Sequence, residues 1–125
     1  MRFLMLVKAD RDYEAGKPPR PELLAAIGGL SEEMGRAGVL LETGGLLPSF
    51  AGAKVKVAGG KLSVTDGPFT ESKELVGGYA IIKAASKAEA IEHGRRFMGL
   101  HAQVLGPSYE GELEIRQLAD FGPDA

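Results

Sequence analysis

The residues best suited to chemistry lie close together at positions 65–79, in the run TDGPFTESKELVGGY. This run contains Asp66, Glu71 and Lys73, and it ends at Tyr79. On irregular backbone, a carboxylate can exchange protons and its charged neighbours can orient a polar ligand. Asp followed by Gly and Pro is equally typical of a plain turn, in which the carboxylate accepts backbone amides and the other charges are solvated. Both interpretations stay open at this point.

His101 is the candidate proton-transfer partner for Asp66, and we expect it just after the second helix. A histidine has an ordinary pKa of about 6.5, so it can shuttle a proton near neutral pH if a carboxylate orients it. A histidine after the end of a helix can also do no more than interact with the helix dipole. Asp66 and His101 are therefore the candidate catalytic residues, and the sequence leaves their proximity open.

Arg116 and Tyr79 are candidate ligand-binding residues on strands, together with Glu71 and Lys73 from the run above. Side chains two apart in a strand share a face, so Arg116 lies beside Glu114. In one interpretation Arg116 forms an ion pair on the surface, and in the other Arg116 binds an anion in the cavity of the dimer. Tyr79 either lines that cavity or packs in the core with its hydroxyl at the edge.

Several kinds of site are not expected. The chain has no cysteine, which excludes disulfides, thiolate metal sites and a cysteine nucleophile. Its histidines, His93 and His101, are eight residues apart and no compact set of carboxylates surrounds them, so we expect no metal. The pairs Gly44–Gly45 and Gly59–Gly60 lack the spacing and the lysine of a phosphate-binding loop. We expect no cofactor, or one borrowed during a reaction.

Length and charge predict one soluble domain over residues 1–125. The chain has a net charge of -2 and no run of lysines and arginines, so nucleic acid is not an expected partner. Its first apolar run, residues 3–7, is far too short for a signal peptide or a membrane span. We therefore expect a cytoplasmic protein that has no membrane partner.

The first half of the chain alternates between strand and helix patterns. Residues 2–9 read as a strand that is apolar on both faces, and residues 10–20 read as an exposed loop. Apolar residues then recur every three or four positions from Pro21, and Gly38 is placed to end this helix. Gly28 and Gly29 inside it suggest a close approach of another backbone. A second strand follows within residues 39–47.

The second half begins with a β-hairpin, because residues 54–57 and 62–64 alternate on either side of Gly59–Gly60. We expect this hairpin at the edge of the sheet, with one solvated face. A doubly apolar strand follows at residues 78–83. Ser86 and Glu89 form a capping box that opens the second helix, and a last strand alternates around Leu113 and Ile115.

This order predicts an α+β fold of ferredoxin-like βαββαβ topology with an inserted β-hairpin. Two helices cover only one face of such a sheet, yet two of its strands are apolar on both faces. A second copy of the sheet is the simplest cover, so the pattern predicts a homodimer. A doubly wound parallel sheet is the rival, and both the hairpin and the charged last strand argue against it.

The run TDGPFTESKELVGGYAII resembles the DGPF signature of the YCII-related proteins. The resemblance extends through RAGVLLETGGLLPS, SKAEAIEHGRRF and GELEIRQL, which together cover nearly the whole chain. It implies a dimeric α/β barrel built from two ferredoxin-like protomers. Proteins of this family mostly lack an established activity, some of their genes lie beside those of alternative sigma factors, and more distant members carry an Asp–His pair proposed as catalytic.

Three functions follow from these observations. The first is an enzyme-like protein in which Asp66 and His101 exchange protons in a polar pocket around the DGPF motif. The second is a small-molecule binder, catalytically inactive and with a regulatory role, in which the same residues orient the ligand. The third is a protein-interaction module linked to sigma-factor-dependent transcription, which the resemblance alone suggests. The sequence does not decide whether the protein is an enzyme.

Overall fold

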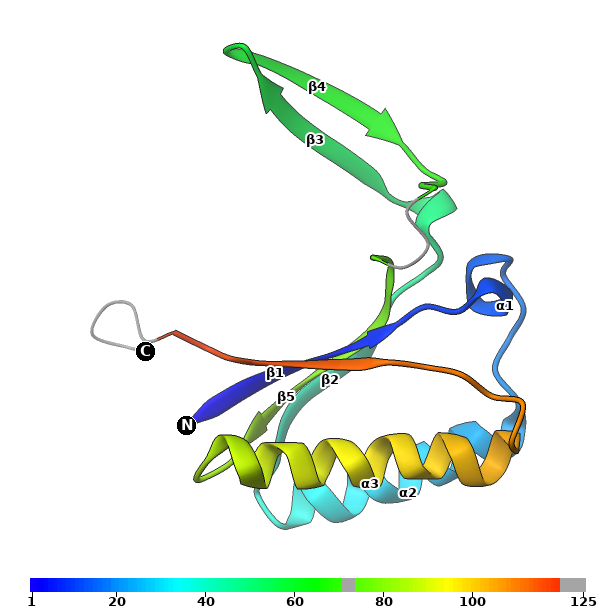
Figure 1. Ribbon diagram of the computed structural model, residues 1–125, viewed down its shortest axis with the longest axis vertical. Helices are drawn as coiled ribbons and strands as arrows, with labels where there is room; N and C mark the ends of the chain where they lie inside the picture. Colours follow the sequence, from blue (N-terminus) through cyan, green and yellow to red (C-terminus); the bar gives the residue numbers. More distant parts are fainter. Residues whose placement is uncertain (71–73, 120–125) are drawn as a thin grey trace.

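The computed structural model describes residues 1–70 and 74–119. Within them, the main body is an antiparallel four-stranded sheet covered on one face by two helices, and a separate two-stranded hairpin projects from it (Figure 1). The elements of the main body, in chain order, are β1 (Arg2–Lys8), α1 (Arg11–Glu14), α2 (Pro21–Arg36), β2 (Leu40–Gly45), β5 (Val76–Lys83), α3 (Lys87–Leu105) and β6 (Leu113–Gln117). The predicted α+β class is confirmed.

The strands of the main sheet lie in the order β2-β5-β1-β6, so the first strand of the chain is central. Phe3 pairs with Ile82 of β5 on one side and with Gln117 of β6 on the other. The long helices α2 and α3 each lie between two strands that are not neighbours in the sheet, which is the element order expected from the sequence. The predicted strands and the long helices are therefore present.

Both long helices begin and end where local chemistry favours it. Pro21 occupies the first turn of α2, where its missing N–H is no loss, and Gly38 follows the helix with a φ of 74°. At the start of α3, the Ser86 hydroxyl accepts the Glu89 amide at 3.1 Å, as the capping box predicts. The helix continues to Leu105, one residue before Gly106 at a φ of 87°.

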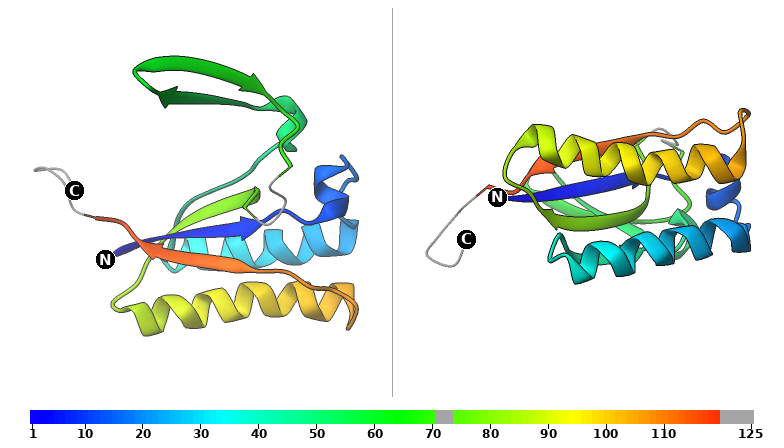
Figure 2. Two further views of the ribbon diagram at one scale, coloured as in Figure 1. Left: turned by 45° about the horizontal axis from the view of Figure 1, so that its top comes forward. Right: turned by 90° about the horizontal axis from the view of Figure 1, so that it is seen from below.

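The core lies between the sheet and the two long helices (Figure 2). Its buried members are Phe3, Met5, Leu30, Met34, Ile82, Ala84 and Ala90. Gly94 brings α3 close to the sheet, because a Cβ there would lie 2.9 Å from the side chains of both Leu113 and Ile115. Side chains of β1 and β5 alternate, so the opposite face of the sheet, here called the open face, carries Leu4, Leu6, Tyr79 and Ile81.

Three local predictions need correction. The hairpin, β3 (Ala53–Ala58) and β4 (Lys61–Asp66), forms its own sheet rather than the edge of the main one. The expected loop at residues 10–20 contains the single-turn helix α1, because the Asp10 side chain accepts the Tyr13 amide at 2.7 Å and caps it. Gly28 and Gly29 face open space, since nothing lies within 4 Å of a Cβ built on either.

Candidate functional site

The structure distributes the predicted site residues over separate regions. Asp66 ends β4 in the hairpin, whereas His101 lies inside α3, on the other side of the main sheet (Figure 1). Arg116 lies on β6, on the open face. His101 borders one cavity; Tyr79 also borders it, although its side chain lies on the opposite face of the sheet, and Asp66 and Arg116 do not border it. Glu71 and Lys73 lie outside the described residues.

This cavity, of about 860 Å³, lies between the main sheet, α2 and α3. Its inner wall is apolar, with side chains from β1, α2, α3 and β6 that include Met5, Leu23, Ile27, Phe97 and Leu113. Its polar lining, here called the polar end, comes from the connections at the carboxyl end of β1 and from the end of α3. The polar end includes Asp10, Tyr13, Arg20, His101, Ser108 and Tyr109, and the charged residues Arg11, Asp12, Lys17 and Glu110 of the same connections also border it.

His101 is the buried polar residue of the core, with 6% of its surface exposed. Its ring lies between Phe97, at 4.7 Å, and Tyr109, which stacks on it at 5.7 Å between ring centroids. The placement after the helix is therefore wrong: α3 extends four residues beyond His101, and the side chain faces the cavity rather than the helix terminus. A role limited to the helix dipole does not fit a buried ring.

A single hydrogen bond determines which His101 nitrogen can meet a ligand. Nδ1 lies 3.0 Å from the Phe97 carbonyl oxygen, which can only accept, so Nδ1 carries the proton. In the neutral ring Nε2 is then an acceptor, and no residue in the described ranges bonds to it. The site can therefore accept a hydrogen bond or a proton at Nε2.

Tyr109 completes the polar end from the connection after α3. Burial raises the pKa of its hydroxyl, and the negative charge of Asp10 raises that pKa further. The hydroxyl therefore stays protonated at neutral pH. Its oxygen occupies the space that a Cβ of Gly111 would need, so the glycine allows the tyrosine to lie there.

The connections that carry the polar end are tied to the rest of the molecule. The Arg20 guanidinium donates to the Val104 carbonyl oxygen at 3.2 Å, which joins the start of α2 to the end of α3. The Tyr13 hydroxyl donates to the Leu46 carbonyl oxygen, which joins α1 to the segment after β2. Asp10 is held in turn by its bond to the Tyr13 amide, and the Tyr109 amide donates to the Gly106 carbonyl oxygen at 3.1 Å.

The DGPF turn is organised by residues that the sequence did not single out. The Ser49 amide and hydroxyl both donate to the Glu14 carboxylate at 2.6 Å, and the Ser49 hydroxyl accepts the Phe69 amide at 3.0 Å. Gly67 lies so close to the Ser49 carbonyl that a Cβ there would clash with it. Lys54 lies over the Phe69 ring, 4.4 Å from its centroid.

Asp66 makes no turn-capping hydrogen bond within the described residues. The neighbouring amides are already used, since Gly67 donates to the Gly52 carbonyl and Phe69 donates to Ser49. Pro68 has no amide hydrogen. Among residues 1–70 and 74–119, nothing donates to the Asp66 carboxylate, and it is exposed. Turn capping by this side chain is therefore not seen in the described part of the chain.

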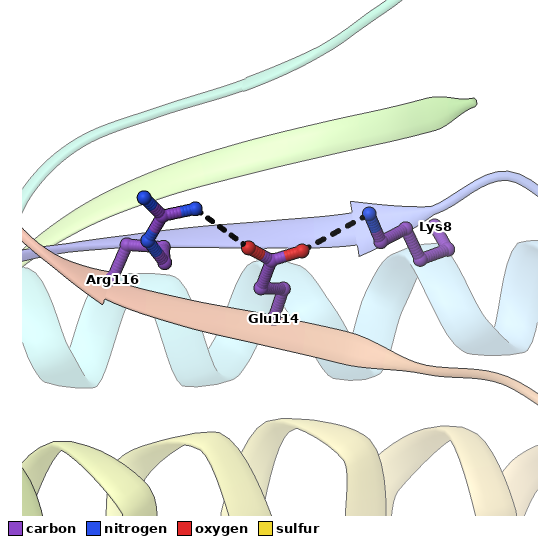
Figure 3. A network of polar contacts seen from close by, with 3 residues as sticks. All are labelled: Lys8, Glu114 and Arg116. Atoms are coloured by element: carbon purple, nitrogen blue, oxygen red, sulfur yellow. Dashed lines mark hydrogen bonds and ion pairs between the residues drawn. The ribbon is translucent and has the colours of Figure 1, made fainter. Parts of the chain in front are cut away.

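Charged residues on the open face form a network (Figure 3). Glu114 accepts from Arg116 at 3.1 Å and pairs with Lys8 at 3.2 Å, so the predicted strand-face pairing is confirmed. The hydrogen bond from Arg116, and then that from Lys8, hold the pKa of Glu114 below its ordinary value. On the same face, the Tyr79 hydroxyl donates to Glu42 at 2.8 Å, and this bond raises the pKa of Tyr79.

Sequence reasoning missed Asp10, Glu14, Ser49 and Tyr109. Asp10 had a usable signal, because an aspartate three residues before an amide that it can cap is a common helix start. Ser49 and Tyr109 lie in irregular connections with no local pattern. His93 is half-buried, and its Nε2 finds no hydrogen-bond partner in the described part of the chain.

Two searches of the described residues bear on the class of protein. No group of three or more histidine and carboxylate side chains in these residues is arranged to hold a metal ion. None of the helices formed by residues 1–70 and 74–119 has the length and hydrophobicity needed to cross a membrane.

Comparison with known proteins identifies relatives of this chain. The model of the YCII-related domain matches residues 1–97. An uncharacterised protein of Rhizobium meliloti (strain 1021) is 33% identical over 87 residues, a stretch that covers 70% of this chain. The same stretch covers 65% of that relative, so the chain spans less than two thirds of the relative's length.

Proposed function

Because this chain belongs to the YCII-related domain family, we propose that it is a homodimeric small-molecule-binding protein whose ligand enters the cavity beside His101. The observation that carries the proposal is the combination of an apolar cavity of about 860 Å³ with a buried histidine that borders it. Cavities of this size and lining are typical of small-molecule sites, where a few polar groups fix the orientation of the ligand.

The polar end offers complementary hydrogen-bonding groups to such a ligand. His101 presents an acceptor at Nε2, and the protonated Tyr109 hydroxyl presents a donor. The apolar wall takes the hydrocarbon part of the ligand. Predicted roles for Asp66 and Arg116 in the same pocket are not part of this proposal, because neither borders the cavity.

The same groups support proton transfer as a second function of the site. His101 can accept a proton at Nε2 while Nδ1 remains bonded to the Phe97 carbonyl, which holds the ring in one orientation. In this second function, Asp10 and Tyr109 have the role of proton-transfer partner to His101 that was predicted for Asp66. Binding and catalysis use one geometry here, so binding is tested first.

The homodimer belongs to the proposal because no helix or strand among residues 1–70 and 74–119 covers the open face. Leu4, Leu6, Tyr79 and Ile81 lie there, whereas α2 and α3 cover the other face. Two copies that pack open face to open face would form the dimeric α/β barrel expected for the family. Light scattering during gel filtration tests it, and the mass of one protomer at micromolar concentration contradicts it.

Binding is tested by nuclear magnetic resonance, because the chain has only two histidines to follow. A fragment library added to ¹⁵N-labelled protein should contain compounds that shift the His101 imidazole signals and leave those of His93 unchanged. His101→Gln should abolish binding of these compounds, and the control His93→Gln should retain it. A library that shifts neither histidine, or hits that bind both variants equally, would contradict the proposed site.

A further inference from the structure

The β3–β4 hairpin has an apolar face that its own chain leaves open in the described residues. Val55 pairs with Val64, and Val57 pairs with Leu62, so these four side chains share one face. They are 68–73% exposed. A two-stranded hairpin is marginally stable on its own in water, and an exposed apolar patch typically marks an interaction surface.

The position of the hairpin indicates what covers this face. The hairpin rises from the main sheet on the side opposite α2 and α3, which is the side of the open face (Figures 1 and 2). A second copy seated on the open face is therefore within reach of the hairpin of the first. The two uncovered apolar surfaces of the chain lie on the same side of the molecule.

The size of the hairpin makes its contribution substantial. It has two strands of six residues, whereas the main sheet has four strands of five to eight. Strands of similar length and spacing present area in proportion to their number, so one face of the hairpin is about half as large as one face of the main sheet. A stable dimer typically needs about 800 Å² from each partner.

We propose that the β3–β4 hairpin is an intersubunit clasp that lays the face formed by Val55, Val57, Leu62 and Val64 on the partner subunit. The clasp rests on the homodimer proposed above. In a two-fold dimer, each copy both gives and receives a hairpin, so the contact occurs twice. The lysine-bearing face of the hairpin remains towards solvent.

The absence of native cysteine permits a direct test by thiol reactivity. Val57→Cys and Lys56→Cys place one thiol on each face of the same strand, and both positions are exposed in one chain. At concentrations where light scattering shows a dimer, the clasp predicts that the thiol of Val57→Cys reacts with Ellman's reagent at least tenfold more slowly than the thiol of Lys56→Cys. Dilution that dissociates the dimer should remove this difference.

Equal reaction rates in a proven dimer would overturn the clasp and leave the homodimer intact. A wild-type protein that stays monomeric at micromolar concentration would overturn both. The two proposals therefore fail in distinguishable ways.

A second test measures the dimer itself. The double variant Val55→Thr with Val64→Thr keeps the shape and strand preference of the hairpin but makes its apolar face polar. The dimer dissociation constant, measured by analytical ultracentrifugation, should rise at least tenfold. Lys56→Thr with Ser63→Thr changes the opposite face and should stay within twofold of wild type. A folded Val55→Thr, Val64→Thr protein with the wild-type constant would overturn the clasp.

Discussion

Ser49 donates both its amide and its hydroxyl to the carboxylate of Glu14, each at 2.6 Å. Thirty-five residues separate the two in sequence. Because the Ser49 hydroxyl also accepts the Phe69 amide, the carboxylate on α1 holds the DGPF turn through one intermediate side chain. The segment beside the polar end of the cavity and the base of the hairpin are thus mechanically connected.

Ser49→Ala should loosen the DGPF turn. The variant removes a hydrogen bond to a charged group and leaves the Phe69 amide without its acceptor, a loss of about 1–3 kcal/mol in local stability. Hydrogen exchange of the Phe69 amide should accelerate accordingly. Asp12→Ala on the same helix is the control, because the Asp12 pair with Lys17 is exposed and worth little. Equal exchange rates in both variants would contradict the connection.

Two glycines of α3 should respond to alanine in opposite directions. Gly94→Ala should destabilise the protein by about 1–3 kcal/mol, because the new methyl group would overlap with Leu113 and Ile115. Gly99→Ala should stabilise it by up to about 1 kcal/mol, since nothing lies within 4 Å and alanine favours the helix. Urea denaturation measures both, and a change of the same sign would show that α3 packs differently.

The Tyr79 hydroxyl should titrate closer to its ordinary value of 10.0 in Glu42→Gln than in wild type. The pKa of Tyr79 is higher in the folded protein than in the unfolded chain. The bond between Tyr79 and Glu42 therefore contributes its full stability below the unfolded-state pKa, and this contribution is lost as pH rises through the folded-state pKa. Near-ultraviolet absorbance follows the titration, and Tyr79→Phe identifies the step. The step of Tyr109, raised chiefly by burial, should stay in place in Glu42→Gln.

Arg116→Gln should return the pKa of Glu114 towards its ordinary value of 4.5. The pKa of Glu114 is lower in the folded protein than in the unfolded chain. The bond between Arg116 and Glu114 therefore contributes stability above the unfolded-state pKa, and this contribution is lost as pH falls through the folded-state pKa. The free energies of unfolding of wild type and variant should therefore differ most near neutral pH and become equal in acid. Arg95→Gln is the control. It removes the same charge as Arg116→Gln, but the distance from Arg95 to its partner Glu92 is longer, at 3.5 Å. Carboxyl-carbon resonance shifts measure the titration of Glu114.

The fold could be predicted largely from local patterns. The alternation around Leu113 and Ile115 and the capping box at Ser86 each determine one element by short-range physics. Which glycine lies against a neighbour depends instead on how a helix is rotated against the sheet. Close approach was therefore expected at Gly28 and Gly29, and it occurs at Gly94.

The candidate site was much harder to predict, because distant connections build it. His101 was assigned to a position after α3, since the helix has no stop signal that distinguishes Gly99 from Gly106 in sequence. Asp10 and Tyr109 meet only because β1 and α3 end at the same side of the sheet. No spacing rule relates residues so far apart. The DGPF segment stood out in sequence, yet the cavity lies elsewhere.

The central place of β1 has a consequence for how the chain folds. Its partners β5 and β6 are made long after it, and Val7 pairs with Leu113 at the end of the sheet. At a synthesis rate of about 5–20 residues per second, β1 waits roughly 5–20 s for β6. During that time Phe3 and Met5 lack their core, and one edge of β1 lacks its hydrogen-bonding partner. Non-local pairing of this kind slows folding, so the ribosome-bound chain is the state most exposed to aggregation.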